Sequence, residues 1–329
     1  MDRASQLIAQ MRKARVVVVG DLIADQFISG RMSRMSREAP VLILKYDSTS
    51  IVPGGAGNAA ANVAALGARV DIVGLVGRDD EGRRLLKALR SANARGVTRA
   101  AGYSTPVKTR ILAGGVHAAK QQIVRIDRTG APVTDAMRRQ VQKQLSRAAR
   151  GADAIIVSDY GSGVINAAMV NAALRSAGRK KPLVLVDSRY AMLTFKGMTA
   201  TTPNESEVEA QLGVTIGEDA RALERAGRAL LKKTRAKSVL ITRGSRGMSL
   251  FEAGERTVHL PIVGSDEVAD VTGAGDTVIA AFALALAAGA TSAEAARLAN
   301  HAGGLVVMKR GTATVSRVEL AGSVAANGF

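Results

Sequence analysis

The segment from Asp270 to Thr277 has the residue types and the spacing best suited to chemistry. It reads DVTGAGDT and leads directly into the apolar stretch VIAAFALALAAG. Glycines at a loop-to-helix junction let backbone N–H groups approach an anion closely, and a helix N-terminus adds partial positive charge. We therefore expect Gly273, Ala274 and Gly275 to form an anion-binding loop. Asp276 is placed to accept the proton of an attacking hydroxyl, although a plain helix cap is the alternative for this residue.

A second glycine cluster, PGGAGN, runs from Pro53 to Asn58 and opens a predicted helix. Gly54 and Gly55 leave room for a bulky polar ligand, and the Asn58 amide can both donate and accept hydrogen bonds. The same stretch matches a dinucleotide-binding fingerprint, which belongs directly after the first strand of a fold. Here the first strand ends in Gly20-Asp21 without such a pattern, which disfavours a dehydrogenase.

Other catalytic classes lack the residues they need. The sequence contains neither GxxxxGKS nor GxxxxGKT, which excludes a Walker-type phosphate-binding loop. It contains no cysteine, which excludes disulfides, thiolate nucleophiles and cysteine-ligated zinc. The three histidines lie far apart without ligand spacing and are expected to pack or to face solvent, at His117, His259 and His301.

The chain is strongly basic, with 46 Lys and Arg against 28 Asp and Glu and a net charge of +18. Such a charge can attract nucleic acid. However, the basic residues are scattered through predicted helices, and only 3% of the residues are aromatic, which leaves little for base stacking. We expect a solvated basic surface that attracts anionic substrates, and no nucleic-acid partner.

No apolar stretch approaches the roughly 20 residues of a membrane-spanning helix. The first residues, MDRASQLIAQMRKAR, lack the apolar core of a signal peptide and lead into the strand-like VVVVG. These features favour a cytoplasmic protein without membrane contact.

Short apolar runs alternate with helical patterns, which predicts a mostly parallel sheet with helices on both faces. We expect a single α/β domain over residues 1–329. The clearest strands are Val16–Gly20, Asp71–Val76, Ala154–Ser158, Leu183–Asp187 and Ser238–Thr242. The clearest helices are Asn58–Leu66, Glu81–Ala94, Asp135–Ala149, Asn166–Ala177, Asp219–Thr234, Gly275–Ala288 and Ser292–Val307.

Two regions break this alternation, at about residues 22–50 and 103–127. Both contain extended pieces without a neighbouring helix, such as Val41–Lys45 and Val107–Leu112. Two hairpins of this kind can form a small β-sheet above the C-terminal edge of the main sheet, where open α/β folds bind ligands. We expect this sheet to act as a lid that excludes water, with a simple extension of the sheet edge as the alternative.

Taken together, the two glycine clusters resemble those of the ribokinase-like (pfkB-type) carbohydrate kinases, and the resemblance covers essentially the whole chain. Between the clusters, the Asn204–Glu207 segment is similar to the family's N-x-x-E motif, and Thr242–Gly244 to its nucleotide-binding strand. The resemblance implies a three-layer α/β/α sandwich with a small β-sheet lid. It also implies ATP-dependent phosphorylation of a sugar with Mg²⁺.

Within that family the sequence is most similar to the heptose 7-phosphate kinases. The supporting strings include SRMSREAPV at Ser33–Val41, SDY at Ser158–Tyr160 and KRGTATVS at Lys309–Ser316. The likeness implies transfer of the γ-phosphate to the anomeric 1-OH of heptose 7-phosphate, giving heptose 1,7-bisphosphate. Relatives with this signature often carry a second, adenylyltransferase domain. No HxGH-type motif is present here, so we expect a kinase activity alone.

The likeness also implies roles for individual residues. The residues expected to bind the sugar are Asp21, Asp25, Arg34, Gly54, Gly55, Asn58, Lys108, Arg110, Asp159, Asp187 and Arg189. Among them, Lys108, Arg110 and Arg189 are the candidate cations for a sugar phosphate. The residues expected to bind ATP are Asn204, Thr242, Gly244, Gly247, Gly273, Gly275 and Asn300. Asn204 and Glu207 are expected to hold Mg²⁺ largely through water, and Asp270 and Thr272 to neighbour a monovalent cation such as K⁺. We further expect a homodimer that forms through the lid.

Two departures leave the sugar itself open. The first strand is followed by GDLIADQF, where heptose kinases usually have a pattern like GDVMLDRY, and Ser188-Arg189 replaces an expected Pro-Lys. An arginine does not substitute freely for a lysine. A kinase of another sugar or nucleoside, such as ribose, fructose phosphate or adenosine, remains an alternative, as does a non-catalytic sensor of sugar or nucleotide.

Overall fold

A computed structural model describes residues 2–92, 94, 96–114, 120–264 and 270–329. Its centre is an eight-stranded sheet in the order β14-β13-β12-β11-β10-β9-β1-β4, in which all neighbours are parallel except the last two strands in the chain. The strands are β1 (Arg15–Gly20), β4 (Arg69–Val73), β9 (Ala154–Asp159), β10 (Leu183–Ser188), β11 (Ala200–Thr201), β12 (Ser238–Thr242), β13 (Met248–Glu252) and β14 (Val258–Leu260).

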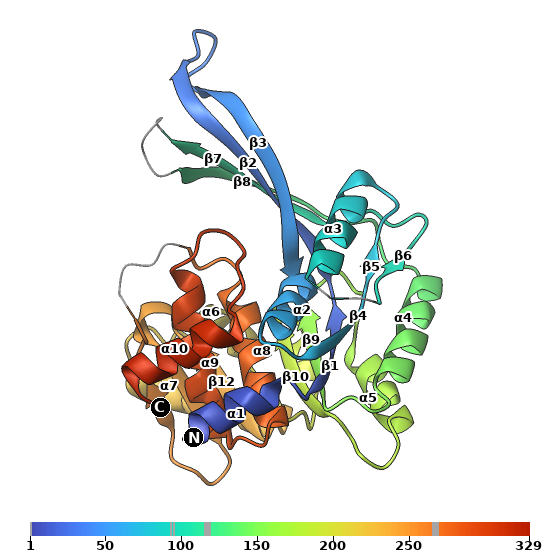
Figure 1. Ribbon diagram of the computed structural model, residues 1–329, viewed down its shortest axis with the longest axis vertical. Helices are drawn as coiled ribbons and strands as arrows, with labels where there is room; N and C mark the ends of the chain where they lie inside the picture. The colour runs from blue at the N-terminus through green and yellow to red at the C-terminus, as the bar shows by residue number, and fades with distance from the viewer. Residues whose placement is uncertain (1, 93, 95, 115–119, 265–269) are drawn as a thin grey trace.

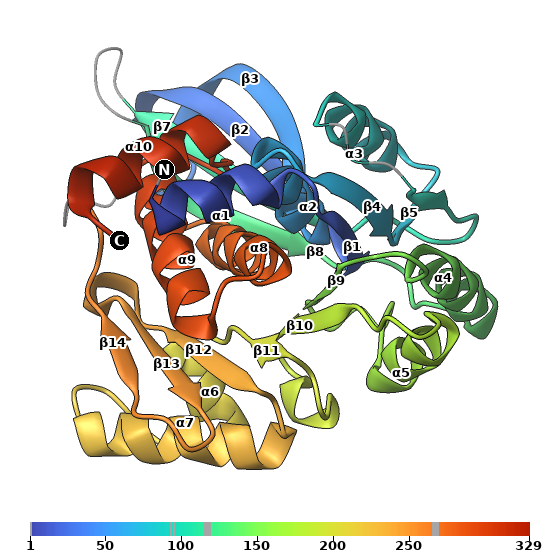
Figure 2. The same ribbon diagram turned by 60° about the horizontal axis from the view of Figure 1, so that its bottom comes forward.

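Helices cover both faces of this sheet (Figures 1 and 2). Six of them share one apolar core, namely α1 (Arg3–Met11), α2 (Ala56–Ala65), α3 (Asp80–Ser91), α8 (Ala274–Ala287), α9 (Ser292–Val307) and α10 (Arg317–Asn327). The opposite core belongs to α4 (Asp135–Ala148), α5 (Ala167–Ser176), α6 (Glu205–Leu212) and α7 (Ala220–Thr234). The expected three-layer α/β/α architecture is confirmed.

Strand β1 shows why its sequence forms a doubly covered strand. Val16 and Val18 are buried in one core, whereas Val17 and Val19 are buried in the other. Successive side chains of a strand point to opposite faces, so a run of valines without polar alternation fits a strand that has helices on both sides.

The two extended regions form one four-stranded sheet in the order β3-β2-β7-β8, which we call the lid. It consists of β2 (Leu22–Met35), β3 (Leu42–Gly55), β7 (Val107–Gly114) and β8 (Gln121–Arg128). The β2–β3 and β7–β8 pairs are antiparallel, but β2 and β7 pair in parallel. The lid projects away from the main sheet in Figure 1, and it begins where β1 ends.

Some elements differ from the sequence-based expectation. The run Asp71–Val76 was expected to be one strand but is divided at Gly74, after which β5 (Leu75–Val76) pairs with β6 (Thr98–Arg99) in a separate small sheet. A Cβ at Gly74 would lie 2.9 Å from the Gly20 carbonyl oxygen, so the backbones approach closely there. Helices α1, α6 and α10 and the antiparallel strands β13 and β14 were not anticipated. In the described parts of the chain, no helix combines the length and apolarity needed to cross a membrane.

Candidate active site

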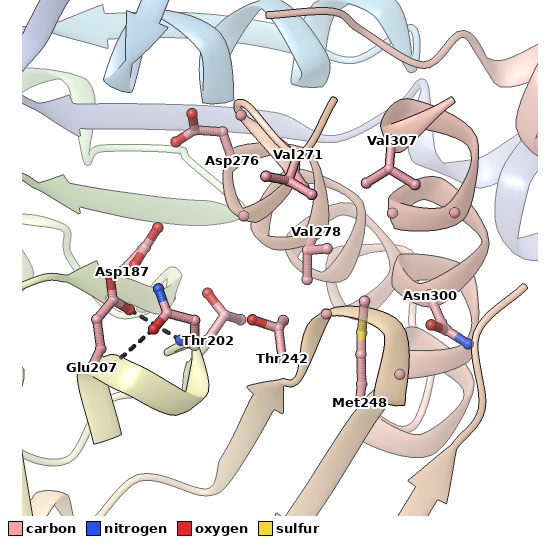
Figure 3. A pocket seen from close by; sticks show the side chains of 18 of the residues that line it. Asp187, Thr202, Glu207, Thr242, Met248, Val271, Asp276, Val278, Asn300 and Val307 are labelled. Carbon is pink, nitrogen blue, oxygen red and sulfur yellow. Dashed lines mark hydrogen bonds between the residues drawn. The ribbon is translucent and has the colours of Figure 1, made fainter. Parts of the chain in front are cut away.

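A cavity of about 460 Å³ lies at the C-terminal edge of the main sheet, next to the start of α8. The ends of strands β9, β10 and β12, the start of α6 and the side of α9 all contribute to its wall. Figure 3 shows Asp276 at one end of this cavity, Asp187 and Glu207 on one side, and Asn300 toward the other end. The cavity therefore brings together side chains from most of the predicted site segments.

Asp276 is buried, with 3% of its surface exposed, in the first turn of α8. Its Oδ2 accepts a hydrogen bond from the Asn58 amide at 3.0 Å, and its Oδ1 accepts one from the Tyr160 hydroxyl at 3.2 Å. Asn58 is held in turn, because the Asn62 amide donates to the Asn58 side-chain oxygen at 3.2 Å. The carboxylate is thus aimed by two donors from different parts of the chain, and it does not serve as a helix cap.

The start of α8 is suited to an anion. Gly273 is the N-cap residue, adopts φ +79°, and provides no side chain that could cap the helix. The Ala274 N–H donates to the Val271 carbonyl at 3.2 Å. Within the described residues the N–H groups of Gly275 and Asp276 have no acceptor. These two N–H groups and the helix dipole leave a positively polarised position at the cavity wall.

Burial raises the pKa of Asp276 to about 7, and the nearby charge of Asp25 acts in the same direction. The hydrogen bonds from Asn58 and Tyr160 oppose the rise, because they favour the charged form. A carboxyl group with a pKa near neutrality is well matched to taking a proton from a hydroxyl and releasing it later.

A second acidic group faces the cavity from β10 and α6. The pKa of Asp187 is raised well above its ordinary value by burial and by the negative charge of Glu207. Glu207 closes a capping box on α6, in which its Oε2 accepts from the Asn204 N–H and its own N–H donates to the Asn204 side chain (Figure 3). Arg189 Nε lies 3.7 Å from the other Glu207 oxygen.

The side chains of Asn204 and Glu207 are the candidates for holding Mg²⁺. No group of three or more acidic or histidine side chains suited to a metal occurs among the residues that the structure describes. One Glu207 oxygen and the Asn204 amide can still hold a hydrated ion through water. Such an arrangement fits Mg²⁺, which keeps several waters and is bound largely through substrate phosphates.

The base of the lid is closed by a buried ion pair. Arg110 on β7 donates to Asp25 Oδ1 on β2 at 2.7 Å, with side-chain exposures of 8% and 7%. The Thr312 hydroxyl donates to Asp25 Oδ2 at 2.9 Å, and the Arg110 guanidinium lies over the Phe27 ring. Arg110 and Asp25 were expected to contact the sugar; here they neutralise each other, which leaves Arg110 a weaker candidate for a sugar phosphate.

Asp21 and Asp159 anchor a loop. Asp21 is fully buried, and its Oδ2 accepts the N–H groups of Tyr160 and Ser162 at 2.8 and 3.0 Å. Asp159 accepts from the Gly161 N–H and from the Ser188 hydroxyl. Burial raises the pKa of Asp21 to about 6. Both residues were expected to grip sugar hydroxyls; in the structure their hydrogen bonds fix the backbone that carries Tyr160.

Lys108 and Arg189 both lie over the ring of Tyr160, and Tyr160 and Arg189 line the cavity. Lys108 Nζ lies 4.7 Å from the centroid of the Tyr160 ring, and Arg189 Cζ lies 5.3 Å from it. Burial and the Arg189 charge lower the pKa of Lys108. The sequence assigned no role to Tyr160, although its SDY string contributed to the resemblance. Only the fold brings this ring against Asp276.

The opposite end of the cavity is more apolar. Its lining includes Met248, Ile262, Val263 and Val307, together with the predicted ATP-binding residues Thr242, Gly244, Gly247 and Asn300. The Asn300 amide donates to the Pro261 carbonyl at 2.6 Å, which orients this side chain. A Cβ at Gly304 would lie 2.2 Å from the Val263 carbonyl oxygen, so α9 can approach the cavity wall only with a glycine here.

The remaining predicted residues lie in different places. Arg34 is exposed on the outer part of β2, away from the cavity lining. Both Asp270 oxygens accept backbone N–H groups, from Thr272 and from Gly311. A Cβ at Gly54 would lie 2.5 Å from Asp25 Oδ2, and Gly55 adopts φ +56°. His301 is buried and bonds to Ser323, His259 is exposed and bonds to Ser249, and His117 lies outside the described residues.

Comparison with known proteins identifies the family that this chain resembles. The family model described as pfkB family carbohydrate kinase matches residues 13–319. The bifunctional protein HldE of Trichlorobacter lovleyi is 40% identical over 328 residues, which cover 98% of this chain and 66% of that protein. HldE of Gluconobacter oxydans is 39% identical over 320 residues, which cover 95% of this chain and 65% of that protein. This chain thus spans a little under two thirds of the length of these relatives.

Solved structures share the fold. Phosphofructokinase-2 from Escherichia coli, in complex with substrates and products, matches with a TM-score of 0.77 at 19% identity, over 96% of this chain and 100% of that one. Ribokinase from Arabidopsis thaliana, complexed with ribose and ATP, matches with a TM-score of 0.71 at 23% identity, over 95% and 99% of the two chains. The ribokinase-like fold expected from the sequence is thereby confirmed.

Proposed function

We propose that this chain, which belongs to the pfkB family of carbohydrate kinases, transfers the γ-phosphate of ATP to the anomeric 1-OH of heptose 7-phosphate, giving heptose 1,7-bisphosphate. Membership of that family makes the chain an ATP-dependent sugar kinase. The observation that carries the chemistry is the position of Asp276, a buried carboxylate with a pKa near 7 beside an uncapped helix N-terminus. We assign the reaction to the cytoplasm, where ATP is supplied.

The chain's own groups account for the steps. Asp276 accepts the proton of the sugar hydroxyl as its oxygen attacks the γ-phosphorus in line. The N–H groups of Gly275 and Asp276 stabilise the charge that develops on the transferred phosphoryl group, and one such donor is commonly worth roughly 3–4 kcal/mol. Bound Mg²⁺, held through water by Asn204 and Glu207, would supply further neutralisation of the phosphate charge.

Two cations support a substrate that already carries a phosphate. Lys108 and Arg189 lie on the same ring, that of Tyr160, which lines the cavity. The pKa of Lys108 is lowered by burial and by the Arg189 charge, although Asp25 and Asp127 oppose this shift. A dianionic phosphate at this position would relieve the repulsion between the two side chains. A neutral sugar would not.

A substrate panel tests the proposal, with ATP consumption measured for heptose 7-phosphate, unphosphorylated heptose, fructose 6-phosphate, ribose and adenosine. We expect the highest kcat/KM with heptose 7-phosphate. Lys108→Met should raise the KM for heptose 7-phosphate by about tenfold or more, the scale of one lost bond to a charged group, and should leave the KM for unphosphorylated heptose unchanged.

Lys143→Met is the matched control, because Lys143 is an exposed lysine on helix α4, outside the lid and the cavity. Its kinetics should equal those of the unmodified chain. Preference for ribose or adenosine would contradict the proposed substrate, and equal effects of Lys108→Met on phosphorylated and unphosphorylated heptose would contradict the role of Lys108.

We also propose a homodimer through the lid. Strand β8 is exposed along its whole length, and β3 and β8 are the edge strands of the lid sheet. Large apolar side chains on the lid face solvent, namely Met32, Met35, Val41, Leu42, Tyr46, Ile123, Val124 and Ile126. Exposed apolar strand edges tend to pair with another chain.

Light scattering should therefore give the mass of a dimer for the unmodified chain. Val124→Lys, which places a charge in the middle of β8, should shift the equilibrium to the monomer. Val318→Lys serves as the control, because Val318 is 79% exposed on α10 and lies outside the lid. A monomeric mass for the unmodified chain at every concentration would refute the dimer.

A further inference from the structure

The backbone around Tyr160 is held by the buried carboxylate of Asp21. It directly follows β9, and its N–H donates to Asp21 Oδ2 at 2.8 Å. The same Asp21 oxygen accepts the Ser162 N–H at 3.0 Å. Asp21 is fully buried, and its other oxygen has no hydrogen-bond partner among the described residues. A buried carboxylate whose hydrogen bonds all come from one loop fixes the position of that loop.

The Tyr160 ring is fixed as well. Lys108 approaches it from lid strand β7, and Arg189 approaches it from the residue after β10. Both cations are within the roughly 6 Å at which an aromatic ring attracts a positive charge. A Cβ at Gly55 would lie 3.3 Å from Tyr160 Cε2, so the glycine cluster also packs against the ring. Three separate segments thus limit the motion of this side chain.

The hydroxyl of this fixed ring reaches the general base. It donates to Asp276 Oδ1 at 3.2 Å, while the Asn58 amide donates to Oδ2 at 3.0 Å. A carboxylate that accepts one bond on each oxygen has its plane defined, and each oxygen retains lone pairs for an incoming hydroxyl. Orientation of this kind is what lets a positioned base act at low entropic cost.

Tyr160 is suited to donate and unsuited to act as the base itself. Burial and the negative charges of Asp276 and Asp187 raise its pKa well above its ordinary value, so the phenol keeps its proton. The charged groups that face Asp276 are Asp25 from β2, Lys108 from β7 and Asp187 from β10. The hydrogen bond from the Tyr160 hydroxyl favours the ionised form of Asp276, whereas burial and the negative charges of Asp25 and Asp187 disfavour it.

We propose that Tyr160 is a positioning residue for the general base, in that its hydroxyl orients the Asp276 carboxylate and favours its charged form. The inference rests on the proposed kinase function. It adds a role for a phenol that contacts the base, held in place by Asp21 and by two cations.

The test is the pH dependence of kcat for Tyr160→Phe at saturating sugar and ATP. This variant removes the hydroxyl and keeps the ring on which Lys108 and Arg189 lie. We expect the acidic limb of the profile to move upward by about one pH unit, the scale of one lost hydrogen bond to a charged group. Activity should fall about fivefold at pH 7, because the ionised fraction of Asp276 drops from about one half to about one tenth, and it should recover largely above pH 8, with the KM for the sugar nearly unchanged.

Tyr103→Phe is the matched control, because the Tyr103 hydroxyl is buried and has no hydrogen-bond partner among the described residues. It should leave the profile in place. A Tyr160→Phe profile that coincides with that of the unmodified chain would overturn the inference. So would a uniform loss of kcat at every pH. A chain with no turnover in its unmodified form would instead refute the proposed function.

A second variant guards against misfolding. Incorporation of 3-fluorotyrosine at position 160 keeps the size and the hydroxyl of the side chain and makes the phenol a stronger donor. We expect the acidic limb to move to lower pH, opposite to the shift for Tyr160→Phe. Thermal unfolding of each variant checks the fold. An acidic limb that does not move with 3-fluorotyrosine would also contradict the inference.

Discussion

Asp276→Asn should lower kcat by at least ~10²-fold, the usual scale for a general base, while the affinity for ATP stays nearly unchanged. The amide keeps the size of the carboxylate and cannot accept the proton. In the unmodified chain kcat should fall as the pH drops through about 7, because the raised pKa of Asp276 leaves the base protonated below that value. The variant should lose this limb. Steady-state kinetics and a nucleotide-binding titration measure both effects.

Asp80→Asn is the control, because Asp80 also lies in the first turn of a helix but is exposed. Asp276→Asn is expected to stabilise the fold, although it lowers activity. A carboxyl whose folded pKa is about 7, against an ordinary value of 3.8, costs stability that is absent below pH 3.8 and grows as the pH rises to about 7. Asp276→Asn should therefore unfold at a higher temperature than the unmodified chain at pH 8. Normal turnover of Asp276→Asn would remove this residue from the mechanism.

Gly273→Ala should lower kcat/KM by about 10²-fold, the cost of losing one preorganised donor. A Cβ at Gly273 would lie 2.4 Å from Asn58 Nδ2 and 3.1 Å from Thr312 Cγ2. The Asn58 amide would have to move, and it is the group that donates to the Gly273 carbonyl and to Asp276. The substitution thus disturbs the anion-binding loop and the base together.

Gly254→Ala isolates this effect from backbone strain. Gly254 adopts the same φ of +79° as Gly273, and no atom lies within 4 Å of its Cβ position. Both alanine variants should lose about 1–2 kcal/mol of stability from the left-handed backbone, and Gly273→Ala should lose more because its Cβ displaces the Asn58 amide. Only Gly273→Ala should also lose activity. Equal kinetics of the two variants would show that the contact with Asn58 does not matter.

The position of the loop that we propose to be catalytic could be predicted from the sequence because its parts are contiguous. Asp276 and its glycines lie within eight residues, and the loop-to-helix transition fixes their relative positions. The partners of Asp276 could not be predicted in this way. Asn58 and Tyr160 are distant in sequence from Asp276, and their approach depends on the packing of α2 and β9 against α8.

The fold shows the same division. The central strands were predicted because buried parallel strands are continuous apolar runs. The lid strands were predicted as extended, but the parallel pairing of β2 with β7 was not, because pairing depends on how the two hairpins leave the main sheet. Helix α6 was missed because it is short, and its capping box was read only as a ligand motif.

The roles of Asp21 and Asp25 show why residue type alone is insufficient. Both carboxylates were expected to bind sugar hydroxyls, and either residue could do so if it faced the cavity. The structure assigns Asp21 to backbone N–H groups and Asp25 to Arg110. One Asp21 oxygen still has no hydrogen-bond partner among the described residues, so sugar binding by these carboxylates stays a prediction.

The lid joins the catalytic centre without any connecting loop. A single residue, Asp21, separates β1 from β2, and β3 ends at Gly55 immediately before α2, which carries Asn58. The β2–β3 hairpin therefore starts and ends next to the residues that surround Asp276. A shift at the base of this hairpin would reach Asn58 directly, because no loop separates β3 from α2.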